Sequence, residues 1–286
     1  MGISVKNLTH IYNEGLPHES VALDNVSFEI NDGEFIGIIG HTGSGKSTLL
    51  QHLNGLLKPK SGQIIVGDTD ITDPSCKLLE IRRRIGLVFQ YPEYQLFEET
   101  VAKDVAFGPK NLGLAQDEID KRVEEAIGLV GLPFEEIREK SPFELSGGQK
   151  RRVAIAGVVA MKPEVLILDE PTAGLDPKAH KDVLEMAYNI HKHEKNITIF
   201  VSHNMADVAR LCDRVFVMDK GKLILSGTPE EVFSEEERLT SIGLSLPPAA
   251  QLMHRLHEAN HAIKAEVFDA ENAAEEIFKF LGDKVC

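Results

Sequence analysis

The apolar run Phe35–Ile39 leads directly into a glycine-rich segment made of Gly40, His41, Thr42, Gly43, Ser44, Gly45, Lys46, Ser47 and Thr48. The segment matches the pattern GxxxxGK[ST], in which backbone N–H groups cradle a phosphate at the start of a helix. In this pattern Lys46 is expected to reach the β- and γ-phosphates, and the Ser47 hydroxyl is expected to coordinate Mg²⁺. A plain glycine-rich turn is the alternative, but the preceding strand favours a nucleotide site in an α/β fold.

Three further segments, residues 85–89, 165–168 and 197–201, are nearly continuous in apolar residues, which is typical of central strands in a parallel sheet. The polar residues Gln90, Asp169 and His203 stand at or just after their ends. Ligands of open α/β sheets bind beyond the carboxyl ends of the strands. We therefore expect these three side chains to converge with the loop that follows residue 39.

Two hairpins are predicted from alternating apolar residues that flank turn signals. Val26, Phe28 and Ile30 alternate before the turn signal at 31–33, so a half-buried hairpin should lead into the strand at 35–39. The second hairpin is expected at 215–225, around a turn at 219–221.

Residues 93–162 show no strand pattern and carry apolar residues at helical spacing, namely Ile119, Val123, Ala126, Ile127 and Val130. This spacing predicts a helical subdomain inserted between two halves of the sheet.

Composition limits the function. The formal net charge of -14 over 286 residues disfavours general affinity for nucleic acid or anionic lipid, so contact with a membrane should run through a protein partner. The longest apolar run, residues 153–161, is too short to span a bilayer. Cys76, Cys212 and Cys286 lie far apart, which predicts neither a disulfide framework nor a zinc site and suits a reducing cytosol.

A second glycine motif lies between the first and the apolar strand at 165–168, and it reads Leu145, Ser146, Gly147, Gly148, Gln149. With residues 40–48 before it and residues 165–170 after it, the chain resembles the ATPase subunits of ATP-binding cassette (ABC) proteins over residues 1–228. The resemblance implies an α/β P-loop NTPase fold with a RecA-like mixed or parallel sheet core. It also implies an N-terminal antiparallel β subdomain, a helical subdomain at about 93–162, a C-terminal helical extension at 229–286, and ATP and Mg²⁺ as cofactors.

The same resemblance assigns roles at the strand ends. Asp169 holds Mg²⁺ directly or through water, and Glu170 is the general base that takes a proton from the attacking water. Gln90 matches the Q-loop glutamine, which senses Mg²⁺ and water beside the surface where a transmembrane partner docks. His203 matches the switch histidine that orients the γ-phosphate. For Asp169 and Glu170 the alternative is a helix-capping acid pair. For His203 the alternative is a structural histidine.

The second glycine motif is expected to serve a partner's ATP. Backbone N–H groups of Ser146, Gly147 and Gly148, followed by Gln149, open a helix and would bind the γ-phosphate held by another subunit. Asp176 resembles the D-loop aspartate that reports on the site across the dimer; an exposed turn acid before a proline is the alternative. Tyr12 matches an aromatic residue that stacks on adenine, with a packing tyrosine as the alternative.

The segment Tyr91 to Phe97, with the residues around 100–114, looks like the ATPases of energy-coupling factor (ECF) importers for vitamins or metal ions, and residues 40–48 look closer to their second ATPase type. This resemblance implies a heterodimer with a related but distinct ATPase, bound to a transmembrane coupling subunit that engages interchangeable substrate-binding membrane proteins. It places the chain at the cytoplasmic face of the membrane, held there by protein partners only. The acidic helical subdomain would receive basic coupling helices of the membrane subunit.

Three alternatives remain open. In a dedicated cobalt or nickel importer, or in a general ABC importer, the chain would hydrolyse ATP in the same way but would serve a different transport system. A non-transport ABC ATPase acting on nucleic acid fits the acidity poorly, and a module that binds ATP without turnover would not need Glu170.

The tail, residues 229–286, carries twelve acids against five bases and two apolar stripes at helical spacing. One stripe is formed by Leu252, Met253, Leu256, Ala259 and Ile263, and the other by Ala274, Ile277, Phe278 and Leu281. The first interpretation is that both stripes pack on the body, and contact with a dimer mate or another partner is the alternative.

Overall fold

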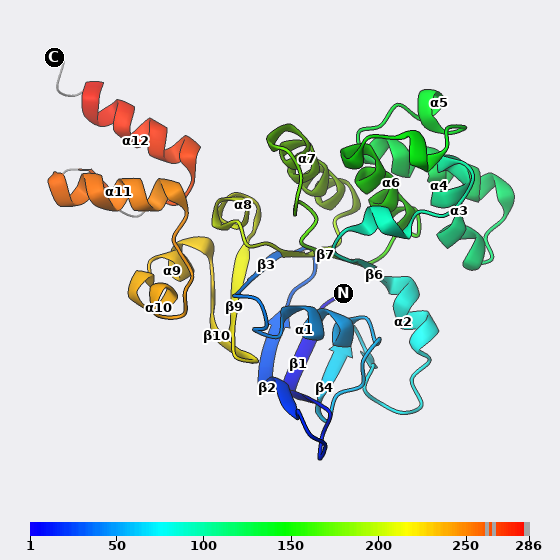
Figure 1. Cartoon of the computed structure of the whole chain (residues 1–286), viewed down its shortest axis with the longest axis horizontal. Coiled ribbons are helices and arrows are strands. Elements are labelled where there is room, and N and C mark those ends of the chain that lie inside the picture. Colours follow the sequence, from blue (N-terminus) through cyan, green and yellow to red (C-terminus); the bar gives the residue numbers. More distant parts are fainter. Residues whose placement is uncertain (261–262, 265–266, 283–286) are drawn as a thin grey trace.

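The computed structural model describes residues 1–260, 263–264 and 267–282, and it contains two β-sheets (Figure 1). The smaller sheet has the strand order β2-β1-β4-β5 and is antiparallel throughout. Its strands are β1 (Ile3–Tyr12), β2 (Ser20–Ile30), β4 (Ser61–Val66) and β5 (Thr69–Asp70). This sheet is the predicted N-terminal antiparallel subdomain.

The larger sheet has the strand order β10-β9-β3-β8-β7-β6. Its strands are β3 (Phe35–Ile39), β6 (Ile85–Val88), β7 (Val165–Asp169), β8 (Ile197–Val201), β9 (Arg214–Asp219) and β10 (Lys222–Gly227). The five strands from β9 to β6 are parallel, and β10 pairs with β9 as the predicted second hairpin. The mixed sheet confirms the expected α/β core.

The first predicted hairpin is wrong. β2 pairs with β1 in the smaller sheet, whereas β3 lies in the larger sheet between β8 and β9. At the turn between them, Glu34 accepts hydrogen bonds from the backbone and side-chain nitrogens of Asn31 at 2.8 and 2.9 Å. β3 is buried along its whole length, so it belongs between parallel neighbours, while the one-sided β2 suits an antiparallel partner.

The elements between residues 93 and 162 are all helical, as predicted. They are the short 3₁₀ turn η1 (Pro92–Gln95), α3 (Val101–Asn111), α4 (Gln116–Leu129), α5 (Phe134–Ile137), the 3₁₀ turn η2 (Pro142–Glu144) and α6 (Gly147–Val159). They form the group at the upper right of Figure 1. Val105 of α3, Ile127 of α4 and Ile155 of α6 are fully buried in one apolar cluster with the sheet, so the subdomain is rooted in the main core.

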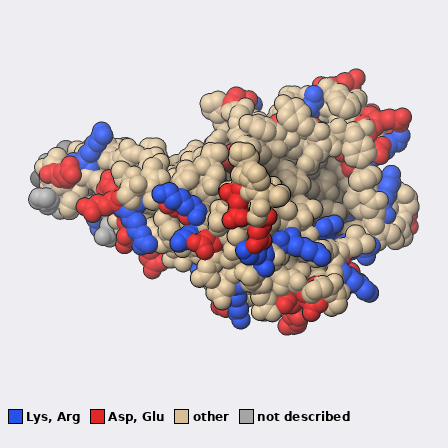
Figure 2. Space-filling view, turned by 60° about the horizontal axis from the view of Figure 1, so that its bottom comes forward, with Lys and Arg blue, Asp and Glu red and all other residues tan. Residues whose placement is uncertain are grey.

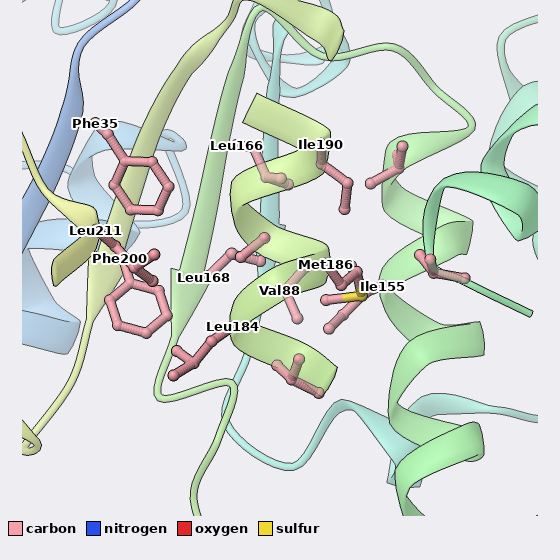
Figure 3. Packing of buried hydrophobic residues seen from close by; sticks show 14 of the residues in the cluster. Phe35, Val88, Ile155, Leu166, Leu168, Leu184, Met186, Ile190, Phe200 and Leu211 are labelled. Carbon is pink, nitrogen blue, oxygen red and sulfur yellow. The ribbon is translucent and has the colours of Figure 1, made fainter. Parts of the chain in front are cut away.

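The remaining helices frame the larger sheet and the tail. They are α1 (Lys46–Leu53), α2 (Leu78–Arg84), α7 (Pro177–Glu194), α8 (Met205–Leu211), α9 (Pro229–Phe233), α10 (Glu236–Ser241), α11 (Pro248–Ala259) and α12 (Ala270–Gly282). Figure 3 shows side chains of α7, among them Met186 and Ile190, meeting those of β7 and α6. Burying each such side chain contributes about 1.5–3 kcal/mol relative to leaving it exposed.

The tail packs in two ways. Val232, Phe233 and Leu239 are buried in the same cluster as the sheet, so apolar packing continues past residue 228. By contrast, α11 and α12 pack mainly on each other, with Met253 and Ala273 at the centre of a small separate cluster.

The predicted stripes are therefore only partly buried, and their packing on the body is largely wrong. Ile277 is partly buried against the small cluster of α11 and α12, but Phe278 and Leu281 are 74 % and 51 % exposed, and Leu252 of α11 is 48 % exposed. The buried face of α12 is centred on Ala273, one position before Ala274, where the predicted stripe begins.

Within the part of the chain that the structure describes, no helix is long and apolar enough to cross a membrane. Cys76 and Cys212 are free thiols, and Cys286 lies outside the described residues.

Candidate active site

The segment between β3 and α1 requires glycine at two positions. Gly40 and Gly45 have φ values of 153° and 103°. A Cβ atom would lie 2.3 Å from the carbonyl oxygen of Met218 at the first position, and 2.5 Å from that of Ala22 at the second. Gly43 also has positive φ, but a Cβ there would meet nothing within 4 Å, so the loop is open on that side. Strand, loop and helix therefore form the cradle that the sequence predicts.

Lys46 lies inside this cradle and is 6 % exposed. Its Nζ donates hydrogen bonds to the carbonyl oxygens of Gly40 at 2.7 Å and His41 at 3.0 Å. Burial lowers the pKa of Lys46, and the negative charges of Glu170 and Asp169 offset part of that effect. A buried ammonium held by carbonyl oxygens is suited to an anionic ligand.

The His41 side chain links the loop at residues 40–48 to Asp219 at the end of β9. Its Nδ1 lies 2.8 Å from the carbonyl oxygen of Thr42, and its Nε2 lies 2.7 Å from Oδ1 of Asp219. Both acceptors lack hydrogens, so the ring satisfies both contacts only when both nitrogens are protonated. These hydrogen bonds, first to Thr42 and then to Asp219, raise the pKa of His41.

Ser47 and Asp169 lie together at the mouth of the cradle. The Ser47 hydroxyl donates to Oδ2 of Asp169 at 3.1 Å. Burial raises the pKa of Asp169, the Ser47 hydrogen bond lowers it, and the nearby charge of Glu170 raises it further. A hydroxyl and a carboxylate at this spacing are hard oxygen donors of the kind that Mg²⁺ prefers, so the residues present fit the ion.

Glu170 connects two of the other strand ends. Its carboxylate accepts a hydrogen bond from Nε2 of Gln90 at 2.9 Å and lies 2.8 Å from Nε2 of His203. Its backbone has a φ of 49°, in the left-handed region, and its N–H donates to the carbonyl oxygen of Val201. The structure thus brings together the three strand ends that the sequence singles out, with Glu170 between them.

Tyr12 ends β1 beside α1. Its hydroxyl is 3.3 Å from Oγ1 of Thr48, its ring meets that of His10 edge-on at 4.5 Å, and 39 % of the residue is exposed. The ring is therefore partly packed and also open to a ligand at the edge of the cradle.

The second glycine motif begins α6 with a capping box. The Ser146 hydroxyl accepts from the N–H of Gln149, and the side-chain oxygen of Gln149 accepts from the N–H of Ser146 at 3.0 Å. In this arrangement the N–H of Ser146 is used by the capping box, and its expected contact with a phosphate stays a prediction. The N–H groups of Gly147 and Gly148 stand in the first turn, where a helix leaves donors without intrahelical partners.

Asp176 caps α7 through hydrogen bonds from the backbone N–H groups of Lys178 and Ala179, both at 3.0 Å. It also lines a hollow of about 460 Å³ together with Ser146, Gly147 and Gly148. No residue of the loop 40–48 lines this hollow. The two glycine motifs of one chain therefore face different spaces.

Sequence reasoning missed two contacts beside the site. Arg151 of α6 is 1 % exposed and binds Glu93 of η1, and His180 of α7 lies 3.0 Å from Asp207 of α8. The spacing of Arg151, Ile155 and Val159, four residues apart on one buried helix face, is the signal that could have revealed the first contact.

A phosphate cradle after β3, a carboxylate pair at the end of β7 in the same sheet, and a second glycine motif set apart from both define a P-loop ATPase of the ATP-binding cassette class. Residues 23–173 match the family model described as ABC transporter. A relative from Clostridium tetani, an energy-coupling factor transporter ATP-binding protein EcfA2, is 58 % identical over 284 residues, which cover 99 % of both chains. The chain belongs to the ABC transporter family, as an ATP-binding and ATP-hydrolysing subunit of the energy-coupling factor type.

Solved structures agree with this fold. That of cbiO1 from Clostridium perfringens, described as part of the ABC transporter complex cbiONQ, matches with a TM-score of 0.75 at 43 % identity and covers 88 % of this chain and 98 % of that one. The dimeric ATP-binding cassette MJ0796, in a post-hydrolysis state bound to ADP and Pi, matches with a TM-score of 0.70 at 29 % identity. It covers 79 % of this chain and 98 % of its own.

Proposed function

We propose that this chain hydrolyses ATP with Glu170 as general base, in a pair with a related but distinct ATPase, and that the pair works beneath a membrane subunit. The observation that carries the proposal is the position of Glu170, held between Gln90 and His203 next to the Ser47 and Asp169 pair. A module that only binds ATP would not need a carboxylate fixed at this point.

The chain's own residues divide the work of the reaction. Lys46 and the N–H groups at the start of α1 would bind the β- and γ-phosphates, while Ser47 and Asp169, with Gln90, would hold Mg²⁺. When bound, Mg²⁺ supplies charge neutralisation at the phosphate oxygens. Glu170 keeps free lone pairs beyond its two hydrogen bonds, so it can accept a proton from a water in line with the γ-phosphate.

His203 and Tyr12 are the two further side chains that we propose contact the nucleotide. His203 donates to Glu170 through Nε2, and we propose that it turns to the γ-phosphate when ATP is present. Tyr12 offers a partly exposed ring on which adenine can stack.

The separate hollow that contains Gly147, Gly148 and Asp176 supports the pairing. This hollow holds no part of the chain's own phosphate cradle, which supports a role for the motif at a nucleotide carried by another subunit. The similar cassette MJ0796 is dimeric in its solved structure, which supports a pairing of two cassettes. The exposed side chains Leu252, Phe278 and Leu281 on the extension at 229–286 offer a further contact for the paired ATPase.

An apolar groove of about 420 Å³ supports the docking of a membrane subunit. It lies among α2, η1, α3 and α6, and its apolar lining includes Leu79, Leu96, Phe97, Phe107, Val158 and Met161. The rings of Phe97 and Phe107 meet edge-on at 4.9 Å and are 58 % and 45 % exposed. Such a groove fits an amphipathic helix of the partner.

The charge of the groove differs from the sequence-based prediction of an acidic surface. Its charged lining consists of Arg82, Arg83 and Asp104, and Asp104 already accepts from the N–H groups of Phe97 and Glu98. Figure 2 shows acidic and basic side chains mixed over the face that it presents. We therefore propose that the membrane subunit docks mainly through apolar side chains.

In this proposal, the chain sits at the cytoplasmic face of the membrane through protein partners, and vitamin or metal specificity resides in separate substrate-binding membrane proteins. Co-expression with the membrane subunit and affinity purification test the docking. Phe107→Glu should reduce recovery of the membrane subunit at least tenfold. Tyr188→Glu on α7, where the tyrosine is 42 % exposed, is the matched control and should not reduce it. Equal recovery with both variants would refute docking in this groove.

The nearest alternative is an ATPase dedicated to cobalt or nickel uptake. It predicts a single fixed substrate-binding component in the purified complex, whereas the ECF arrangement predicts several interchangeable ones. The identity of 58 % to an energy-coupling factor protein over nearly the whole chain favours the latter.

A further inference from the structure

Arg151 is the largest side chain in the described part of the molecule that is almost completely buried, and it uses nearly all of its hydrogen-bonding capacity. Its Nε and Nη2 donate to the two carboxylate oxygens of Glu93 at 2.9 and 2.7 Å. Its Nη1 donates to the carbonyl oxygens of Pro171 at 3.1 Å and Ala173 at 2.6 Å. Four of the five guanidinium N–H groups therefore have protein acceptors.

The acceptors belong to segments that perform different tasks. Glu93 lies in η1, three residues after the Q-loop residue Gln90 and two residues before Gln95, which lines the apolar groove. Pro171 and Ala173 lie in the turn between Glu170 and Asp176. Arg151 itself lies in the first turns of α6, the helix that begins with the second glycine motif. One planar group thus joins the groove, the turn after the catalytic carboxylate and the signature helix.

The turn that Arg151 holds is the one that sets the backbone of Glu170. The N–H of Ala173 donates to the carbonyl oxygen of Glu170, and Glu170 has left-handed backbone geometry that its surroundings must maintain. Through Arg151, the same turn is fixed to Glu93. A displacement of η1 would therefore change where this turn, and with it Glu170, comes to rest.

The ion pair between Arg151 and Glu93 is held in one specific geometry. Burial alone would raise the pKa of Glu93, but the hydrogen bonds from Arg151, a backbone hydrogen bond and the charge of Arg151 together lower the pKa by more, so it falls below its ordinary value. The guanidinium also lies 5.7 Å from the ring centre of Tyr91. A buried ion pair stabilises a protein little compared with apolar packing of the same volume. The main effect of the pair between Arg151 and Glu93 is therefore the fixed geometry that it imposes on the segments it joins.

We propose that Arg151 is a positioning residue that transmits the position of η1, at the groove, to the turn between Glu170 and Asp176, so that docking of the membrane subunit sets the rate of ATP hydrolysis. The inference rests on the proposed docking in the groove. It assigns Arg151 no contact with the nucleotide. Lysine cannot reproduce its role, because a single ammonium lacks the fork that reaches the carboxylate and both carbonyls together.

The test compares the ATPase pair with and without its membrane subunit in nanodiscs. Arg151→Lys should leave recovery of the membrane subunit and the KM for ATP within twofold of wild type. It should lower the stimulation of kcat by the membrane subunit about tenfold. Glu93→Gln weakens the same ion pair from the side of the carboxylate and should lower the stimulation of kcat by the same factor. The double variant should show no greater loss of stimulation than either single variant.

Arg214 provides the matched control, because its guanidinium also binds a carboxylate, that of Glu34 at 3.2 Å, and a backbone carbonyl, that of Glu29 at 3.1 Å, but it lies at the first residue of β9, at the opposite end of the parallel strands from Glu170. Arg214→Lys should keep full stimulation. Retained stimulation in Arg151→Lys and Glu93→Gln with normal docking would overturn the positioning role. Loss of stimulation only in proportion to a fall in melting temperature would also overturn it. The docking proposal fails separately, if Phe107→Glu still recovers the membrane subunit.

Discussion

Replacing Glu170 by Gln tests the assignment of the general base with little change in shape. Both carboxylate oxygens of Glu170 accept hydrogen bonds, from Gln90 and His203. In the variant, the amide oxygen can keep the His203 contact, and Gln90 can turn its own amide to present oxygen to the new NH₂ group. Both hydrogen bonds then survive, so the free energy of unfolding should change by less than about 1 kcal/mol.

The rate should change far more than the stability. A positioned general base contributes about 10²- to 10⁴-fold, which corresponds to about 3–5 kcal/mol of activation free energy. Steady-state phosphate release by the ATPase pair should fall by that factor, and size-exclusion chromatography with ATP should show a more persistent closed pair. Glu164→Gln, just before β7, where the carboxylate pairs with Arg84 at 2.8 Å, is the control and should keep the wild-type rate. A rate within tenfold of wild type for the Glu170 variant would refute the base assignment.

Two further predictions concern the loop tether and the tail. Because hydrogen bonds raise the pKa of His41, the contribution of its protonated contact with Asp219 should be full below about pH 6.5 and should disappear as pH rises through the raised pKa. An NMR titration of the ring should show this, and the pKa should drop in Asp219→Asn; an unchanged value would contradict the tether. Phe233→Ala should cost about 3–5 kcal/mol in chemical denaturation because the ring is fully buried, whereas Phe278→Ala, at an exposed position, should cost less than about 0.5 kcal/mol. Equal losses would show that the tail packs differently.

The strand ends could be predicted from sequence because parallel strands bring their carboxyl ends to one edge. Gln90, Asp169 and His203 each follow a run of apolar residues, and that local pattern fixes where each side chain must stand. The glycines at 40 and 45 are equally local, since each occupies a backbone conformation that glycine adopts at low cost.

The pairing of β2 and the partners of Arg151 could not be predicted in the same way. Whether an alternating strand joins its neighbour in sequence or a distant strand depends on contacts that no local pattern encodes. Arg151 and Glu93 are separated by 58 positions, and a charged residue on an apolar helix face indicates burial without indicating its partner. Which face of α12 is buried could not be predicted either, because Ala273 and Ala274 are adjacent and identical, and the sequence does not show which of the two faces α11.

The order of strands in the larger sheet also affects how the protein is made. β3, which carries the phosphate cradle, has no neighbour close to it in sequence: Phe35 pairs with Thr198, and Gly37 pairs with Val215. During synthesis from the N-terminus, the cradle therefore cannot be completed until residues beyond 215 have left the ribosome, whereas the helical subdomain is built from contacts between helices close in sequence. The nascent chain thus exposes an unpaired apolar strand for most of its synthesis, and we expect a need for chaperone protection that ends only when β8 and β9 arrive.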